Sequence, residues 1–295
     1  MKLITILGPT SSGKTDLSIK LAHHLIKNGQ KVAILSCDSR QVYKDLNLLS
    51  GKAPGTWSQS QLINNSQSYI VEEIEHFLID FVELTKVYSL NDYIHDYISI
   101  VELLNKKVDY VLLVGGTGLF ARAVTEEYQL PNMREESVAS LSLSELQSKL
   151  NKDDFNNSDW NNPIRLHNRL KTEKVNNKSI AYPIFEDKIK FILKPNNKYL
   201  ESKVRSRIIS RIEQGMLIEL QDLIASYGKT RIDSLGLECR YGIQHLEGLL
   251  TQQEFIDTLT VKTMQYIKRQ NTWNNKEPNS IVITSLEDIL TKLHS

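Results

Sequence analysis

The sequence lacks the features typical of secreted, metal-clustered or membrane-embedded proteins. It contains only two cysteines, Cys37 and Cys239, which lie far apart and at no spacing typical of metal ligands. We therefore expect two reduced thiols, the usual state in the cytoplasm. No apolar run approaches the roughly 20 residues that cross a bilayer, and Met1-Lys2 leads directly into an apolar segment rather than a signal peptide. These absences predict a cytoplasmic protein with no membrane association.

The sequence also lacks an excess of charge of either sign. Its 36 Lys and Arg residues nearly balance 35 Asp and Glu residues, for a net charge of +1. Because affinity for nucleic acid depends on the cations near the contact, any RNA binding must come from local patches. A chain of 295 residues is long enough for one large α/β domain with a substantial core and a smaller appendage. No internal repeat is present and nothing calls for an oligomer, so we expect a monomer.

A complete phosphate-binding loop, G-x-x-x-x-G-K-[ST], lies near the N-terminus. It consists of Gly8, Pro9, Thr10, Ser11, Ser12, Gly13, Lys14 and Thr15. An apolar run typical of a strand, Leu3–Leu7, precedes the loop, and an amphipathic helical pattern over Lys14–Ile26 follows it. In such a loop backbone N–H groups face an anion, Lys14 adds a positive charge and Thr15 can hold Mg²⁺. The motif predicts binding of a di- or triphosphate.

Short apolar runs alternate with helical patterns over the first part of the chain. The expected strands are Leu3–Leu7, Val32–Ser36, Phe77–Asp80 and Tyr110–Val114, and the expected helices are Lys14–Ile26, Ser66–Glu75 and Asn91–Leu104. This alternation predicts an α/β fold with a doubly wound parallel sheet, like that of P-loop NTPases, whose ligand lies beyond the carboxyl ends of the strands. Gly8, Asp38 and Gly115-Gly116-Thr117 each follow a strand, so we expect them to converge on one crevice.

The pattern changes after about residue 121. We expect residues 1–121 to form the first part of the core, 122–183 a small helical insertion, and 184–295 a return to the core with long helices. Tyr128–Asn177 is polar with thin apolar stripes, so a disordered linker is the alternative to a helical insertion. A strand over Asp187–Lys194, helices over Asn197–Tyr227 and Gln253–Trp273, and a strand over Ile281–Thr284 complete the expected elements.

Two of these strand ends carry candidate functional residues. At Asp38 the carboxylate could accept a proton, hold Mg²⁺ through water, or only cap a helix. Gly115-Gly116-Thr117-Gly118 could bind phosphate or a base edge, or could only permit a tight turn. Nucleotide hydrolases usually have an Asp at the end of such a strand, whereas Tyr110–Val114 ends in Gly115 and the run ending in Asp80 is a poor match. This weakens an ATPase interpretation.

Basic and aromatic residues gather late in the chain. Lys268-Arg269-Gln270 with Trp273 forms one group, and Asn197–Tyr227 carries Lys198, Lys203, Arg205, Arg207 and Arg211. Taken singly, such charges are commonly a solvated helix face. Taken together, they could supply phosphate contacts and a stacking surface for single-stranded RNA.

The chain resembles the tRNA dimethylallyltransferases, or isopentenylpyrophosphate:tRNA transferases, from the first strand almost to the C-terminus. The matching segments are Gly8–Thr15, Asp38-Ser39-x-Gln41-Val42-Tyr43, His76-x-Leu78-Ile79-Asp80, Tyr88-Ser89-x-x-Asp92-Tyr93, Leu113-Val114-Gly115-Gly116-Thr117-Gly118-Leu119-Phe120, Lys178-Ser179-Ile180, Arg207 with Gly215-Met216, Arg240 with Leu246-Glu247-Gly248, and Thr263-x-Gln265-Tyr266-x-Lys268-Arg269-Gln270-x-Thr272-Trp273. The combination is highly specific.

The resemblance implies a substrate pair and roles for site residues. The loop would bind the diphosphate of dimethylallyl diphosphate with Mg²⁺, and the acceptor would be the exocyclic N6 amine of the adenosine 3′ of the anticodon in tRNA. Asp38 would be the general base, Thr117 would contact the same adenosine and Arg207 would neutralise the leaving diphosphate. The implied tRNA-binding residues are Asp38, Ser39, Arg40, Gln41, Thr117, Arg165, Arg240, Lys268, Arg269, Gln270 and Trp273.

The chain departs from the family pattern mainly in regions that would face RNA. The departures are Leu49-Ser50-Gly51-Lys52, Arg165-Leu166-His167-Asn168-Arg169-Leu170-Lys171, and Met264 in place of an Arg; Arg134 is a candidate insertion contact. They bear on tRNA affinity and choice more than on reaction type. The alternatives are an adenylate isopentenyltransferase of the cytokinin type, a catalytically weakened RNA-binding relative, and an ATP-dependent small-molecule kinase.

Overall fold

The computed structural model describes residues 1–129, 141–155, 157–172, 180–195 and 199–293. The chain divides into two compact units, one made of Met1–Glu126 with Pro183–Ser295 and the other of Glu127–Tyr182. Within the described residues no helix is both long and apolar enough to cross a membrane.

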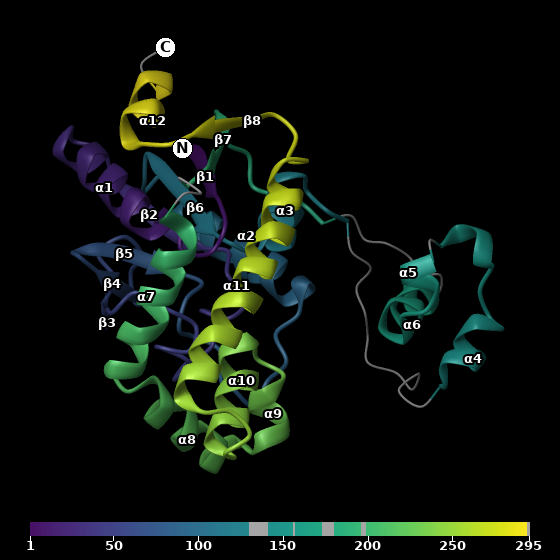
Figure 1. Cartoon of the computed structure of the whole chain (residues 1–295). Helices are drawn as coiled ribbons and strands as arrows, with labels where there is room; N and C mark the ends of the chain where they lie inside the picture. Colours follow the sequence, from purple (N-terminus) through teal and green to yellow (C-terminus); the bar gives the residue numbers. More distant parts are fainter. Residues whose placement is uncertain (130–140, 156, 173–179, 196–198, 294–295) are drawn as a thin grey trace. The chain divides into compact units, whose positions relative to one another are not determined.

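An eight-stranded sheet, counted over the described residues, forms the centre of the larger unit (Figure 1). Its order is β3-β4-β5-β2-β6-β1-β7-β8, with bounds Lys2–Leu7 (β1), Val32–Ser36 (β2), Thr56–Gln59 (β3), Gln67–Val71 (β4), Ile74–Phe77 (β5), Tyr110–Gly115 (β6), Lys188–Leu193 (β7) and Ser280–Ile283 (β8). From β5 through β2, β6, β1 and β7 to β8, each strand is parallel to its neighbour. The pairs β3–β4 and β4–β5 are antiparallel. The predicted doubly wound parallel sheet is confirmed.

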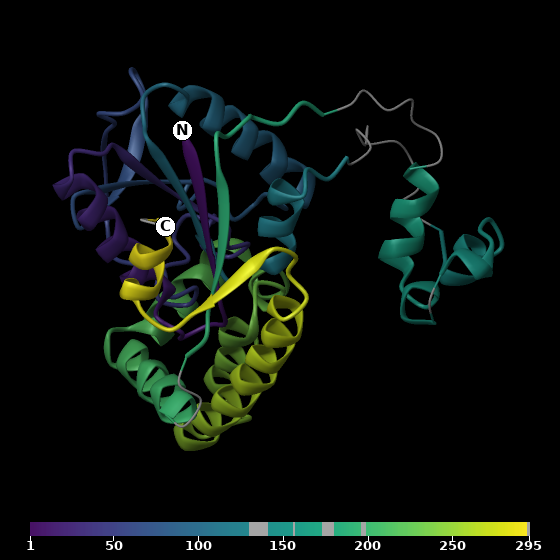
Figure 2. The ribbon, with the colours of Figure 1, turned by 90° about the horizontal axis from the view of Figure 1, so that it is seen from above.

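The central strands are buried on both faces, which explains their continuous apolar runs. Helices α1 (Lys14–Lys27) and α12 (Leu286–Leu293) cover one face, and α2 (Leu90–Leu104) and α3 (Gly118–Thr125) cover the other (Figure 2). Leu21 of α1 and Ile6 of β1 are fully buried in the shared core. Each such side chain contributes about 1.5–3 kcal/mol relative to an exposed one.

A layer of C-terminal helices packs together around a second core (Figure 1). Its members are α7 (Leu200–Glu213), α8 (Met216–Tyr227), α9 (Lys229–Asp233), α10 (Leu237–Leu246) and α11 (Gln252–Asn274). The prediction of one helix over Asn197–Tyr227 is wrong, because Gly215, with φ of 103°, ends α7 and begins α8. Residues 196–198 lie outside the described residues, while α11 matches its expected bounds within one residue.

The predicted helix over Ser66–Glu75 is also wrong, because this segment is the β4–β5 hairpin. Glu72 and Glu73 form its two-residue turn with φ of 47° and 66°, the positive values that a tight hairpin turn requires. The strand expected over Phe77–Asp80 ends at Phe77, since Leu78 and Asp80 also have positive φ and the chain turns away from the sheet.

The smaller unit is helical over its described residues. It contains α4 (Leu143–Gln147), a 3₁₀ turn (Lys152–Asp154), α5 (Asn157–Trp160) and α6 (Pro163–Thr172). Leu146 and Leu166 are buried, so these segments are not the alternative disordered linker. The limits differ from the expected 122–183 because α3 continues through Thr125, which leaves residues 122–126 in the larger unit.

Candidate functional site

The carboxyl ends of β1, β2 and β6 meet at one edge of the sheet. Leu7 pairs with Gly115 and Ser36 with Val114, so the loops that follow these strands begin side by side. A Cβ added to Gly115 would lie 2.5 Å from the Cys37 carbonyl oxygen, which makes glycine necessary there. The expected convergence of these three loops is confirmed.

The phosphate loop has the backbone shape of an anion cradle. Ser11 and Gly13 have φ of 61° and 94°, and within the described chain no side chain caps the start of α1. Uncapped N–H groups at a helix N-terminus attract anions. Thr10, Ser11, Gly13, Lys14 and Thr15 line the adjoining cavity. Gly8, Pro9 and Ser12 do not line it; they shape the loop, and a Cβ on Gly8 would lie 2.8 Å from the Leu193 carbonyl.

Lys14 is held against its own loop. Its Nζ donates to the Pro9 carbonyl at 2.7 Å and to Ser12 Oγ at 3.5 Å. Burial lowers the pKa of Lys14 to about 8, opposed in part by the nearby Asp38 carboxylate. The ammonium is therefore held in a place where an added anion would restore its pKa.

Arg207 reaches the loop from α7. Its guanidinium donates to Ser11 Oγ at 3.4 Å and to the Gly51 carbonyl at 3.1 Å. Burial and, to a lesser extent, the neighbouring Arg211 lower its pKa. A second cation, from α7, thus lines the cavity.

Asp38 has one carboxylate oxygen in use and one available. Its Oδ1 accepts from the backbone N–H of Arg40 at 2.9 Å and of Gln41 at 3.3 Å, so it caps a turn rather than the helix that the capping alternative supposed. Its Oδ2 has no hydrogen-bond partner among the described residues. The turn thus holds the carboxylate in place and leaves one oxygen for a ligand.

Thr117 joins this turn from the end of β6. Its Oγ1 accepts from the Ser39 N–H at 3.2 Å and donates to Ser39 Oγ at 3.5 Å. Gln41 Nε2 donates to the Gly51 carbonyl at 3.3 Å. Ser39, Gln41 and Thr117 therefore position the turn that carries Asp38.

Two cavities adjoin at Asp38. The phosphate-loop cavity, of about 470 Å³, includes Lys14, Thr15, Arg207 and Gln41 in its walls. The Tyr266 cavity, of about 190 Å³, is lined by Ser39, Arg40, Thr117, Glu238 and Tyr266 among others. Thr10, Asp38 and Ser50 line both. Two ligands could therefore meet at this carboxylate.

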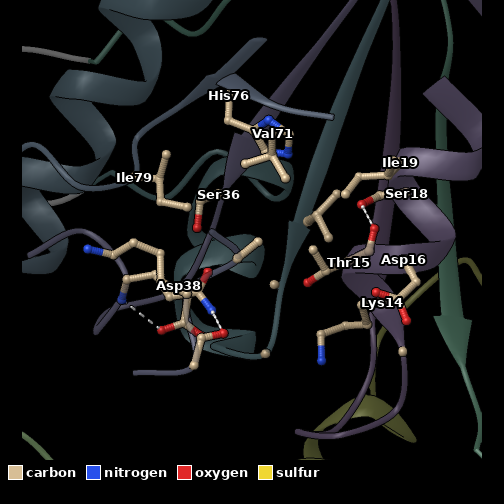
Figure 3. A pocket seen from close by; sticks show the side chains of 18 of the residues that line it. Lys14, Thr15, Asp16, Ser18, Ile19, Ser36, Asp38, Val71, His76 and Ile79 are labelled. Carbon is tan, nitrogen blue, oxygen red and sulfur yellow. Dashed lines mark hydrogen bonds between the residues drawn. The ribbon is translucent and has the colours of Figure 1, made fainter. Parts of the chain in front are cut away.

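The phosphate-loop cavity has an apolar end away from its cations. Figure 3 shows Val71, His76 and Ile79 gathered there, with Lys14 and Asp38 facing each other at the other end. Nδ1 of buried His76 lies 2.9 Å from the Ile74 carbonyl, and burial lowers the pKa of the ring. This neutral, largely apolar end suits a hydrocarbon group, whereas the cationic end suits phosphate.

Gln270 is mostly buried between two loops and also lines the Tyr266 cavity. Its Oε1 accepts from the Thr10 N–H at 2.9 Å, and its Nε2 donates to the Gly116 carbonyl at 2.8 Å. Only 7% of the residue is exposed. Both ends of its amide are occupied by backbone groups, and the predicted contact with tRNA stays a prediction.

The other basic and aromatic residues lie on the surface. Lys268 and Arg269 are exposed on α11, and the Arg122 guanidinium lies 4.9 Å from the centre of the Trp273 ring. Arg240, on α10, forms a 3.5 Å ion pair with Asp233 and lines neither cavity.

The remaining RNA contacts expected from the resemblance concern the insertion. Arg165 lies on α6 in the smaller unit and pairs with Asp159. Arg134 and Lys178-Ser179 lie outside the described residues.

The donor set fits a jointly held Mg²⁺ ion. Thr15 lines the phosphate-loop cavity with Asp38, yet no three His, Cys, Asp or Glu side chains of the described residues are grouped to hold a metal. Mg²⁺ commonly takes one or two protein ligands and completes its shell with phosphates and water. These residues could hold Mg²⁺ together with a diphosphate.

Sequence reasoning missed several residues that shape the site. Glu219 of α8 accepts from the backbone N–H groups of Asn47, Leu48 and Leu49, and so fixes the loop that presents Gly51 to Arg207. Tyr266 was visible only as part of a matching motif. No local sequence pattern predicts the Glu219 contacts or the place of Tyr266 in the cavity wall, because both depend on segments that are distant in the sequence.

Comparison with known proteins gives a consistent result. The family model "IPP transferase" matches residues 41–277, and "Isopentenyl transferase" matches residues 1–80. The chain is 30% identical to tRNA dimethylallyltransferase 2 of Shewanella sediminis, over 92% of this chain and 88% of that one. It is also 30% identical to tRNA dimethylallyltransferase 2 of Treponema denticola, over 95% and 94%.

Solved structures agree in fold. A tRNA isopentenylpyrophosphate transferase from Bacillus halodurans matches with a TM-score of 0.68 and 23% identity, covering 99% of this chain and 94% of that one. A eukaryotic dimethylallyltransferase acting on tRNA matches with a TM-score of 0.66 and 21% identity, covering 97% and 75%. With a family model that spans most of its length, this chain belongs to the IPP transferase family.

Proposed function

We propose that this protein transfers a dimethylallyl group from dimethylallyl diphosphate to the exocyclic N6 amine of the adenosine 3′ of the anticodon in tRNA, releasing diphosphate. The observation that carries the proposal is that Asp38 lines two adjoining cavities. One has cations at the phosphate loop and an apolar end, and the other has Thr117 and Tyr266 in its walls. Transfer of a prenyl group requires the donor and the acceptor to touch, and two cavities that share Asp38 as a wall residue allow this.

The phosphate-loop cavity suits an allylic diphosphate. The N–H groups at the start of α1, Lys14 and Arg207 would stabilise the negative charge that grows on the leaving diphosphate. Mg²⁺, held by Thr15 and the diphosphate oxygens, would supply further charge stabilisation. Val71, Ile79 and His76 would enclose the hydrocarbon group and exclude water from it.

The Tyr266 cavity suits an adenine base taken out of its stack. An enzyme reaches a base atom inside a folded RNA only when the base is extruded. The free Oδ2 of Asp38 would accept the proton that the N6 amine loses as its nitrogen bonds to the allylic carbon. Thr117 and Ser39 would hold the base and the turn in register.

The exposed Lys268, Arg269 and Trp273 would bind the surrounding anticodon loop, since cations contact phosphates and aromatic rings stack on bases. This surface favours whole tRNA over a free adenine nucleotide, which would not need it. We further propose that the protein acts as a monomer in the cytoplasm.

The test is a substrate assay. Purified protein is incubated with Mg²⁺, tRNA and labelled dimethylallyl diphosphate, with and without ATP, and nucleosides are analysed after digestion. We expect label on N6 of one adenosine and no effect of ATP. Equal transfer to AMP would favour the adenylate-type alternative, and strict dependence on ATP would favour a kinase.

A further inference from the structure

We infer that Gln270 is a positioning residue that ties the phosphate loop to the loop after β6, and so couples the donor site to the acceptor site. The inference rests on the proposed function and gives Gln270, which also lines the Tyr266 cavity, a role in holding the two loops. The Gln270 amide joins two loops that lie 260 and 154 residues earlier in the sequence. Among the described residues, the Thr10 N–H and the Gly116 carbonyl have no other side-chain hydrogen-bond partner.

The bridge is specific for a carboxamide. The Thr10 N–H needs an acceptor and the Gly116 carbonyl needs a donor, and an amide of this length supplies both at 2.9 and 2.8 Å. A Cβ added to Gly116 would lie 2.9 Å from Nε2, so the two are in close contact. Removing one partner of a buried hydrogen bond leaves the other unsatisfied, which is costly.

The Gln270 bridge also determines which backbone N–H groups of the phosphate loop remain free to bind phosphate. Gln270 takes the Thr10 N–H, while the start of α1 stays uncapped by any described side chain. An anion would therefore be directed toward Gly13, Lys14 and Thr15 rather than toward Thr10. Thr10 itself lines both cavities, so its placement affects donor and acceptor together.

The bridge joins these loops to the helix proposed to bind RNA. Gln270 is buried, whereas Lys268, Arg269 and Trp273 on the same helix are exposed. The exposed side chains of α11 would supply most of the RNA affinity, whereas the buried amide would hold the two loops. We therefore expect the affinity for donor to depend on Gln270 and the affinity for tRNA to be largely independent of it.

The experiment compares Gln270→Met with the parent, because Met has a similar length but neither donates nor accepts strongly. We expect the KM for dimethylallyl diphosphate to rise about 10-fold and kcat to fall about 10-fold, with the Kd for tRNA within about twofold of the parent. Gln252→Ala, an exposed change on the same helix, controls for effects on α11 and should alter none of these.

Gln270→Glu adds a readout that a purely structural role would not move. The new carboxyl can donate to the Gly116 carbonyl only when protonated, and its buried position raises its pKa. Its activity relative to the parent should therefore rise as pH falls from about 8 to 6. A KM unchanged in Gln270→Met, or a Kd for tRNA raised alone, would overturn the inference; a parent that transfers no prenyl group would instead refute the proposed function.

Discussion

The walls of the two cavities and the exposed face of α11 are built in different ways. In the walls, polar side chains are fixed by hydrogen bonds to backbone groups distant in the sequence, as Arg207 is to Gly51 and Gln270 is to Gly116. On the exposed face, the Lys268 and Arg269 side chains extend toward solvent, and the Arg269 guanidinium lies 5.8 Å from the centre of the Tyr266 ring. The fold thus holds the cavity walls in a fixed geometry, whereas the RNA affinity proposed for α11 would depend on exposed charge.

We expect the largest loss of activity from a change at Asp38, which lines both cavities. Asp38→Asn should lower turnover by about two to four orders of magnitude, because the amide keeps an oxygen for the Arg40 and Gln41 N–H groups but cannot take the proton. Single-turnover rates at saturating donor measure the effect, with tRNA binding as the control. A loss below about tenfold would mean that Asp38 only caps its turn.

The next effect concerns the cation at the loop. Lys14→Met should raise the donor KM and lower kcat, together costing about 3 kcal/mol in kcat/KM if the charge acts mainly on the leaving diphosphate. Steady-state kinetics with the donor varied measure this, and the Kd for tRNA should not move. An equal loss in donor and tRNA affinity would indicate a general collapse of the loop.

A smaller effect follows from the lowered pKa of Lys14. With a pKa of about 8 in the free protein, this group loses its proton as pH rises through 8, whereas a bound diphosphate favours the charged form. The donor KM should therefore rise up to about 10-fold from pH 7 to pH 9. The rise should be absent in Lys14→Met, and a rise that persists there would place the titration elsewhere.

The smallest effects belong to the exposed face. Lys268→Ala and Arg269→Ala should each weaken tRNA binding by about 3- to 10-fold at low salt and reduce the salt slope by about 1, with the donor KM unchanged. Lys20→Ala, an exposed lysine on α1, is the matched control. Loss of donor affinity in either variant would show that the exposed face of α11 and the cavity walls do not have separate roles.

The sequence predicted the regions whose structure follows from local pattern. Val32–Ser36 is a strand as expected because a buried parallel strand is apolar throughout, and the phosphate loop carries its motif in adjacent residues. The β4–β5 hairpin was missed because its two-residue turn is formed by Glu72 and Glu73 rather than by Asn or Gly. A glycine, Gly215, interrupts a pattern that otherwise reads as one helix.

The site was predictable in position but not in its supporting contacts. Motifs brought Lys14, Asp38 and Thr117 to one sheet edge, since the carboxyl ends of parallel strands meet there. The burial of Gln270 could not be foreseen, because its neighbours Lys268, Arg269 and Trp273 are exposed. Glu219 likewise acts only through tertiary structure, by capping a loop about 170 residues earlier.

The central claim is that donor and acceptor occupy adjoining cavities at the same time, on either side of Asp38. The direct test is the Kd for tRNA with and without a saturating, unreactive thio analogue of dimethylallyl diphosphate, in the presence of Mg²⁺. We expect a ternary complex, with the Kd for tRNA unchanged or lower. Mutually exclusive binding, in which the analogue displaces tRNA competitively, would contradict it.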